Sequence, residues 1–470
     1  MKNKLFFSFY IKQDIIYRMK KNYLNYLRDG KALSFHQQIL LTLQLSFPAI
    51  LAQLTSVVMQ YIDASMVGHL GANASASIGL MTSTTWLFGG LILAINAGFT
   101  VQISQSIGAK KEQEARSILK HGFCAVLIAG FIFALLGALI SPFLPIWLGG
   151  SPEICSKASQ YFFIYIISMP IIILAQYAGS SLQASGNMRV PSIVNILICF
   201  LDVVFNWFFI FLLNLGVIGA AIGTVLAEFV GAGILLYILL LKSDFLRLHQ
   251  KEHFSFNKAY FKRALKIGSP VAFEQIIMGS AYVLLTRIVA PLGSIAVAAH
   301  SFAITAESFC YMPGYGIESA SMTIIGQTVG ANRKDLAKRL GWLSIILAMI
   351  IMAGSGLFLY FGSPFMMKLL TSDTHIQQLG IKVLQLEAFA EPMYAASIVA
   401  SGVFRGAGDT LVPSMMSFIS MWAVRLTLAY IMAPIYGLFG IWLAMFIELN
   451  FRGIIFLIRM FSGKWLPKKV

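Results

Sequence analysis

The stretch SQSIGAKKEQEA at residues 104–115 has a counterpart, GQTVGANRKDLA, at residues 326–337, so the displacement between the two is 222. The same displacement relates SGNMRVPS at 185–192 to AGDTLVPS at 407–414. Two shorter matches share it, Pro48 with Pro270 and Leu70–Gly71 with Leu292–Gly293. A fixed displacement of this kind indicates an internal duplication. The sequence therefore predicts two halves of the same fold.

The composition is that of a membrane protein. Of the 470 residues, 58% are hydrophobic and 11% are charged, and the mean hydropathy is +0.78. Soluble domains carry about 25% charged residues. At about 20 residues for each membrane-spanning helix, the chain has room for about a dozen helices. A soluble enzyme, a nucleic-acid-binding protein and a disordered scaffold are all disfavoured.

Long apolar runs, broken by Gly, Pro and charged residues, predict an all-α polytopic membrane protein with 12 transmembrane helices. The predicted spans are 39–67, 74–104, 122–144, 157–182, 191–213, 217–241, 267–290, 295–327, 341–363, 376–403, 413–434 and 438–459. Each half holds six of them. Because six is even, both halves enter the membrane from the same face, as two pseudo-twofold-related six-helix bundles around a central cleft.

The charge distribution predicts the domain boundaries and the orientation. We expect a basic N-terminal arm at 1–37, bundles at 38–241 and 267–460, a linker at 242–266 and a basic tail at 461–470. With the N-terminus inside, 29 of the 35 Lys and Arg residues lie on the cytoplasmic side. The positive-inside rule then places both termini in the cytoplasm. It also explains the net charge of +16 without a nucleic-acid partner.

Acidic residues inside the spans are the first candidates for function. A lone carboxylate in mid-bilayer costs about 2.5 kcal/mol or more, so each one needs a partner, a proton or a wet cavity. Nine of the nineteen acidic residues lie in predicted spans, namely Asp63, Asp202, Glu228, Glu274, Glu307, Glu318, Glu387, Glu391 and Glu448.

The N-terminal half offers the tightest group. Asp202 and Asn206 are four residues apart and share one helix face, while Ser56, Gln60 and Asp63 form a polar stripe on the first helix. Carboxylate and amide oxygens suit a proton or a cation such as Na+. The alternative is a set of interhelical hydrogen bonds worth about 0.6 kcal/mol each. Asp63 and Asp202 have no acidic counterpart in the second half, where Leu285 and Val424 stand.

The C-terminal half carries a second acidic group, Glu274, Glu307, Glu387 and Glu391. These residues could add a proton-carrying cluster or contact a cationic substrate. The alternative is that they pair with arginines inside the membrane. For Glu448 we predict such a pair, with Arg425 on the neighbouring helix as the partner.

Enzymatic functions are less well supported. The string GAGD at 406–409 matches a GxGD motif of intramembrane aspartyl proteases, but the apolar run has ended there, which places Asp409 in a cytoplasmic turn. No HExxH or GxxxxGK[ST] string occurs. We expect no enzyme, no metal centre and no cofactor beyond the coupling ion.

The chain resembles the multidrug and toxic compound extrusion (MATE) family over roughly residues 38 to 465. The resemblance rests on five segments, FPAILAQLTSVVMQYIDASMVGHLG (47–71), APLGSIAVAAH (290–300), GQTVGAN (326–332), GVFRGAGDTLVPS (402–414) and GLFGIWLAMFIE (437–448). It implies a V-shaped pair of six-helix bundles that exports organic cations and amphipathic compounds in exchange for H+ or Na+. We expect a monomer in the bacterial inner membrane.

The resemblance also assigns residues. Asp63 matches the family's acidic position in the first helix, and Thr224 matches a sixth-helix position in the same network. Relatives often place Asn four residues before Asp in the fifth helix, whereas Asp202 and Asn206 have the reverse order. Met278 and Tyr394 occupy the positions at which some members couple through the C-terminal half, so coupling through the N-terminal half is favoured.

A lipid-linked oligosaccharide flippase of the same superfamily is the alternative within transport. Such a flippase is expected to line its cleft with cationic residues. Here only Arg287, Arg425 and Arg452 lie within predicted spans apart from Lys157, Lys382 and Arg459 near span ends.

Overall fold

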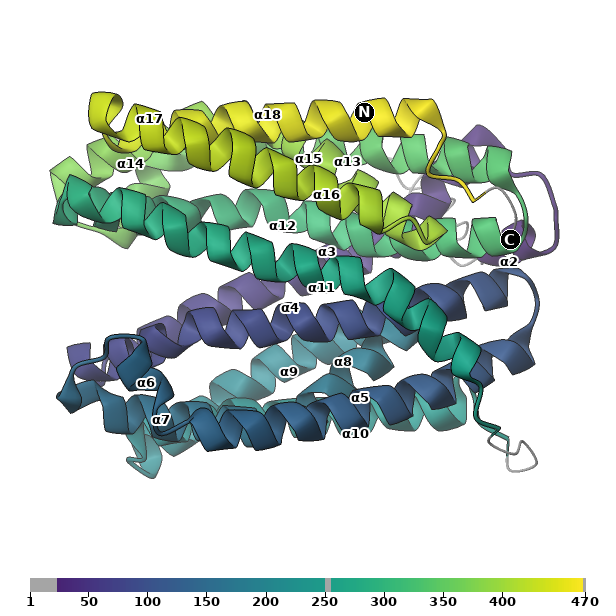
Figure 1. Ribbon diagram of the computed structural model, residues 1–470, viewed down its shortest axis with the longest axis horizontal. Coiled ribbons are helices and arrows are strands. Elements are labelled where there is room, and N and C mark those ends of the chain that lie inside the picture. Colours follow the sequence, from purple (N-terminus) through teal and green to yellow (C-terminus); the bar gives the residue numbers. More distant parts are fainter. Residues whose placement is uncertain (1–22, 250–254, 468–470) are drawn as a thin grey trace, which may run out of the picture.

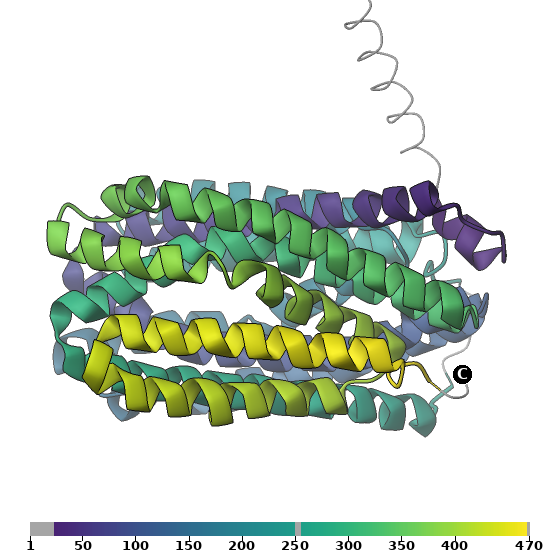
Figure 2. The same cartoon turned by 90° about the horizontal axis from the view of Figure 1, so that it is seen from above.

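The computed structural model describes residues 23–249 and 255–467. Most of the predicted N-terminal arm, five residues of the predicted linker and the last three residues of the tail lie outside the described residues. Figures 1 and 2 show long helices that run nearly parallel to the longest axis of the molecule. The predicted all-α fold is confirmed.

The helices of the first half follow in sequence order. They are α2 (Tyr23–Arg28), α3 (Phe35–Gly68), α4 (Ala72–Gly108), α5 (Glu112–Ile140), α6 (Leu144–Trp147), α7 (Pro152–Ile167), α8 (Met169–Ala184), α9 (Arg189–Trp207) with its extension η1 (Phe208–Leu212), and α10 (Gly216–Tyr237) with its extension η2 (Ile238–Lys242).

The helices of the second half, coloured teal-green to yellow, lie beside those of the first half in Figure 1. They are α11 (Lys258–Val289), η3 (Ala290–Leu292), α12 (Ser294–Gly330), α13 (Lys334–Leu370), α14 (Thr374–Glu387), α15 (Glu391–Ala407), α16 (Leu411–Ile419), η4 (Ser420–Leu426), α17 (Thr427–Tyr436) and α18 (Leu438–Ser462).

Two of the twelve predicted spans are broken. In the described part of the chain, ten helices are long and apolar enough to cross a membrane, and the pair α7–α8, bent by 49°, makes an eleventh span. The span predicted at 376–403 is two helices, α14 and α15, of 14 and 17 residues. The sequence predicted one continuous helix for this span and one for 157–182. Both predictions were wrong, because each span consists of two helices.

Proline explains both breaks. Pro170 lies in the first turn of α8 and Pro392 in the first turn of α15. Proline fits a helix start, but it cannot continue the preceding helix because its ring clashes and it lacks an N–H. The two prolines occupy equivalent positions of the repeat. The breaks are therefore one feature of the duplicated unit.

The halves meet through α3, α4, α11 and α12. A Cβ atom on Gly108 of α4 would lie 2.0 Å from the backbone oxygen of Gln327 on α12. A Cβ atom on Gly330 of α12 would lie 1.9 Å from the backbone oxygen of Gln105 on α4. The two contacts are related by the repeat. At this point α4 and α12 touch backbone to backbone, and only glycine fits.

The short helix α2 joins both halves at the same end of the molecule. We call this end the basic end, because Lys110, Lys111 and Arg333 lie in its loops. The Arg28 side chain donates from Nη2 to the backbone oxygen of Ser185 in the first half (2.8 Å) and from Nε to Oε1 of Gln327 in the second (3.1 Å). Leu24 and Leu27 of α2 are fully buried.

Candidate functional site

Glycines on α10 bring this helix close to α9. A Cβ atom on Gly223 would lie 2.2 Å from Oδ1 of Asn206, and one on Gly231 would lie 2.3 Å from Cδ1 of Ile198. Gly219, four residues before Gly223, faces the backbone of Phe209 in the same way. Small residues at this spacing let helix backbones approach in a membrane. The close approach fixes the side chain of Asn206.

Asn206 joins the two aspartates of the first half. Its Nδ2 donates to Oδ1 of Asp63 on α3 (3.0 Å) and to Oδ2 of Asp202 on α9 (3.2 Å). Asp202 and Asn206 are 1% and 2% exposed. Thr224 of α10 lies beside Asp202. We call Asp63, Asp202 and Asn206 the aspartate site.

The aspartate site contains hydrogen-bond acceptors that no donor of the described residues satisfies. Oδ1 of Asp202 and Oδ1 of Asn206 are buried without a hydrogen-bond partner among the described residues. No Lys or Arg of the described chain pairs with either aspartate. Two neighbouring carboxylates in such surroundings cannot both stay charged at low cost. The site is therefore suited to hold one proton or one small cation.

Ser56 and Gln60 do not join the aspartate site. Ser56 accepts a hydrogen bond from Nδ2 of Asn195 (2.9 Å) and lines a separate cavity, and Gln60 is exposed. The predicted stripe with Asp63 is thus divided. Seven residues of helix separate Ser56 from Asp63 by about 10 Å along the axis, which is too far for one shared site.

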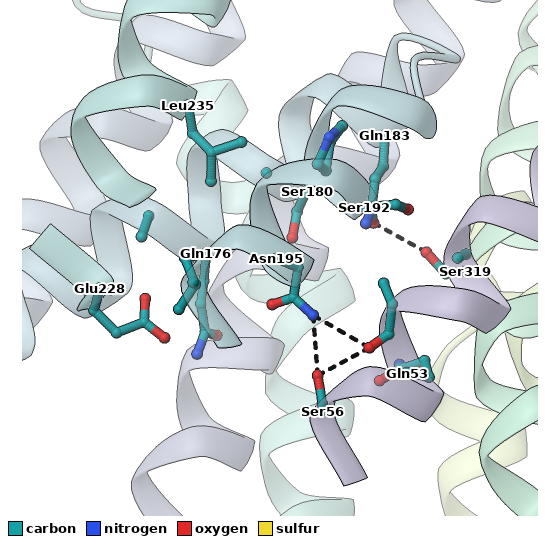
Figure 3. A pocket seen from close by; sticks show the side chains of 16 residues that line it. Gln53, Ser56, Gln176, Ser180, Gln183, Ser192, Asn195, Glu228, Leu235 and Ser319 are labelled. Atoms are coloured by element: carbon teal, nitrogen blue, oxygen red, sulfur yellow. Dashed lines mark hydrogen bonds between the residues drawn. The ribbon is translucent and has the colours of Figure 1, made fainter. Parts of the chain in front are cut away.

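The cavity that Ser56 lines has a volume of about 400 Å3 (Figure 3). It lies between α3, α8, α9 and α10, and Ser319 of α12 closes it from the second half. We call it the amide cavity because Gln53, Gln176, Gln183 and Asn195 line it. Its one charged residue is Glu228.

In the second half, Arg405 holds two acidic residues. Its Nη1 donates to Oε1 of Glu318 (2.9 Å) and its Nη2 to Oε2 of Glu274 (3.4 Å), which also accepts from Oγ of Ser414 (2.9 Å). The predicted span ends at residue 403, which leaves Arg405 outside it. Arg405 is inside α15. Hydropathy misplaced Arg405 because the acids that neutralise it are distant in sequence.

The other acids of this half gather near the break between α14 and α15. Glu387 ends α14, Glu391 begins α15, and both are buried beside Glu307. Glu274 is not among them, so the predicted acidic group is divided. Oε2 of Glu387 and both carboxylate oxygens of Glu391 have no hydrogen-bond partner among the described residues.

Glu448 lies between two arginines. The predicted partner Arg425 places Nη1 3.8 Å from Oε2 of Glu448. Arg452, four residues along α18, is closer, and its Nε donates to Oε1 at 2.7 Å. Oγ of Ser420 donates to the same oxygen at 2.6 Å. Arg452 was missed as a partner, although its i, i+4 spacing from Glu448 was visible in the sequence.

Asp409 is far from the aspartate site. It lies between α15 and α16 at the basic end and accepts a hydrogen bond from Nε of Arg459 (2.9 Å). Asp63 lies five residues before the far end of α3. Asp409 and Asp63 therefore lie toward opposite ends of the molecule, and the aspartate of the GAGD string does not pair with Asp63.

The features above define a class of protein, a duplicated helical membrane protein in whose first half Asn206 links two aspartates. The sequence model of the MatE family matches twice, at residues 48–208 and 270–431, which together make up more than half of the chain. The two matches begin at Pro48 and Pro270, which are equivalent positions of the repeat. The chain belongs to the MATE family.

Relatives of similar length support this assignment. The probable multidrug resistance protein NorM of Thermotoga maritima is 28% identical, over 95% of this chain and 96% of the relative. A protein of the same description from Bacillus cereus is 26% identical, over 91% of this chain and 96% of its own.

Solved structures show the same fold. A MOP superfamily transporter from Pyrococcus furiosus and a MATE transporter from Vibrio cholerae both superpose with a TM-score of 0.86, at 21% and 20% identity. Each comparison covers 91% of this chain and 97% of the other chain.

Proposed function

We propose that this chain is a secondary active antiporter that exports organic cations and amphipathic compounds in exchange for H+ or Na+. The observation that carries the proposal is the aspartate site, in which Asn206 joins Asp63 and Asp202 without a basic partner in the described chain. Two neighbouring carboxylates inside a membrane favour the uptake of a cation, and a proton or Na+ is the simplest one. No cofactor is needed.

The proposed mechanism is alternating access. The two halves rock about their interface, and occupancy of the aspartate site changes which arrangement is favoured. We place the basic end in the cytoplasm of a bacterial cell, with the protein in the inner membrane as a monomer. The contacts of α4 with α12 then close the cytoplasmic side. One charge moving down 100 mV supplies about 2.3 kcal/mol, enough for about a 50-fold substrate gradient.

The polarity of the amide cavity argues against a flippase for lipid-linked sugars. None of the sixteen residues that line this cavity is basic. A pyrophosphate headgroup requires cationic contacts. Three arginines of the second half already have carboxylate partners. Arg405 pairs with Glu274 and Glu318, and Arg425 and Arg452 pair with Glu448.

The test is ethidium transport in everted membrane vesicles, with a proton or sodium gradient imposed separately. We expect one gradient to drive transport in the wild type, and both Asp63→Asn and Asp202→Asn to abolish it. Asp409→Asn is the control, since its partly buried ion pair with Arg459 lies at the basic end, away from the aspartate site, and it should keep wild-type transport. Unchanged transport in both site variants would eliminate coupling through the aspartate site.

A further inference from the structure

Glu228 is a membrane-embedded carboxylate that the aspartate site does not use. It lies on α10, four residues after Thr224 and therefore about 6 Å nearer to the basic end. The described residues give it neither a hydrogen bond nor an ion pair, and its side chain points into the amide cavity (Figure 3). An ionisable group at this depth without a protein partner indicates a binding function.

The rest of the cavity lining can hydrogen-bond but carries no further charge. Gln176 and Ser180 of α8 lie on the same wall region as Glu228, and Oγ of Ser192 is buried without a partner among the described residues. None of the sixteen lining residues is aromatic. The cavity can therefore hold a cation through charge and hydrogen bonds, but not through the faces of aromatic rings.

The cavity also spans the boundary between the halves. Oγ of Ser319 on α12 donates to Oε1 of Gln183 (3.0 Å), and Oγ1 of Thr323 donates to the backbone oxygen of Gln183 (3.1 Å). Ser319 and Gln183 both line the cavity. Separation of α8 from α12 at the basic end would break these bonds and open the cavity to that side.

We propose that the amide cavity is a second cation site, in which Glu228 binds the ammonium group of the transported substrate. This inference rests on the proposed function. The preferred ligands are compact cations with several N–H or O–H donors, such as protonated polyamines, because amide and hydroxyl oxygens surround a single carboxylate. Its size lies within the usual range for small-molecule sites.

The two cation sites influence one another. Glu228 and Asp202 are electrostatic neighbours. A proton or Na+ at the aspartate site removes negative charge near Glu228 and so weakens the hold on the ammonium group. For charges one to two helical turns apart in a medium of low dielectric, a change of about tenfold in affinity is expected. This coupling would release substrate when the driving ion binds.

The experiment measures binding of spermidine and of tetraphenylphosphonium, which has no N–H donor, to the purified full-length protein by calorimetry. Glu228→Gln should weaken spermidine binding at least tenfold and tetraphenylphosphonium binding less than threefold. Glu228→Asp should recover part of the spermidine affinity. Gln176→Leu should weaken spermidine binding severalfold. Glu112→Gln, which removes an exposed carboxylate at the basic end of the same half, is the matched control.

Unchanged spermidine affinity in Glu228→Gln would overturn this inference, and so would equal losses for both ligands. Thermal unfolding of each variant checks that it is folded. If Glu228→Gln does not fold, Gln176→Leu provides an independent test of the cavity. Asp63→Asn should still bind spermidine, with an affinity lowered about tenfold at most, because the substitution removes negative charge near Glu228. If wild-type vesicles transport ethidium but Glu228→Gln binds spermidine normally, only this inference fails. If spermidine binds at Glu228 but neither gradient drives transport, the proposed antiport fails.

Discussion

Equivalent residues of the two halves line a cavity in the first half and form an ion pair in the second. In the first half Ala52, Gln183 and Ser192 line the amide cavity. Their counterparts in the repeat are Glu274, Arg405 and Ser414, which hydrogen-bond to one another. One copy of the duplicated unit therefore keeps a cavity where the other is filled by an ion pair.

The distribution of charge follows the same division. In the second half Arg405, Arg425 and Arg452 neutralise Glu274, Glu318 and Glu448. In the first half Asp63, Asp202 and Glu228 have no basic partner in the described chain. Buried pairs contribute cohesion, whereas unpaired carboxylates remain available to ions. The division is incomplete, because Glu387 and Glu391 of the second half also have buried carboxylate oxygens without a hydrogen-bond partner among the described residues.

The largest expected effect comes from removing the central arginine of the second half. Arg405→Met leaves Glu274 and Glu318 without their arginine, and breaking a buried pair costs about 3–5 kcal/mol. At the equivalent position of the first half, Gln183→Met removes only the interhelical hydrogen bond from Ser319, worth about 0.6 kcal/mol. Denaturant unfolding in detergent measures both. Equal losses would contradict the division between the halves.

A second variant transfers the ion pair into the cavity. Ala52→Glu alone buries an unpaired acid and should destabilise the protein. Adding Gln183→Arg should restore about 1–3 kcal/mol, as coupling between neighbouring residues does, and should fill the amide cavity. We expect the double variant to fold but to lose spermidine binding in calorimetry. Retained binding would show that the ligand sits elsewhere.

The glycine contacts should respond alike in both halves. Gly108→Ala and Gly330→Ala each force α4 and α12 apart, and overpacking of this kind costs about 1–3 kcal/mol. Because the contacts are related by the repeat, the two losses should agree. Gly354→Ala in α13 is the control, since its Cβ would meet nothing within 4 Å. Denaturant unfolding measures the loss of stability in each variant. Clearly unequal losses would show that the two glycine contacts are not equivalent.

The smallest effect is expected at α2. Arg28→Ala removes the hydrogen bonds to Ser185 and Gln327, worth about 0.5–1.5 kcal/mol each. Hydrogen exchange of residues 23–28 should accelerate, while unfolding of the whole protein changes little. Lys338→Ala serves as the control because the Lys338 side chain is exposed and lies on α13. Unchanged exchange in Arg28→Ala would mean that Leu24 and Leu27 hold α2 alone.

Much of the fold could be predicted from periodicity. The repeat predicted the two halves, and the two family matches begin at equivalent positions of it. The helix breaks were missed, although Pro170 and Pro392 signalled them. A hydropathy window averages over about 19 residues and does not register one proline.

The candidate site was only partly predictable. The i, i+4 spacing brought Asp202 and Asn206 together, and the family resemblance added Asp63. The cavity around Ser56 and Glu228 could not be foreseen, because it depends on how α8, α10 and α12 pack in three dimensions. Arg405 illustrates the same limit, since both of its acidic partners lie on other helices.

The placement of α2 has a consequence for how the chain can be shortened. This helix precedes the first residue matched to the family, yet it is anchored to both halves through Arg28. A truncation that starts at the family match would therefore remove a segment that holds the two halves together at the basic end.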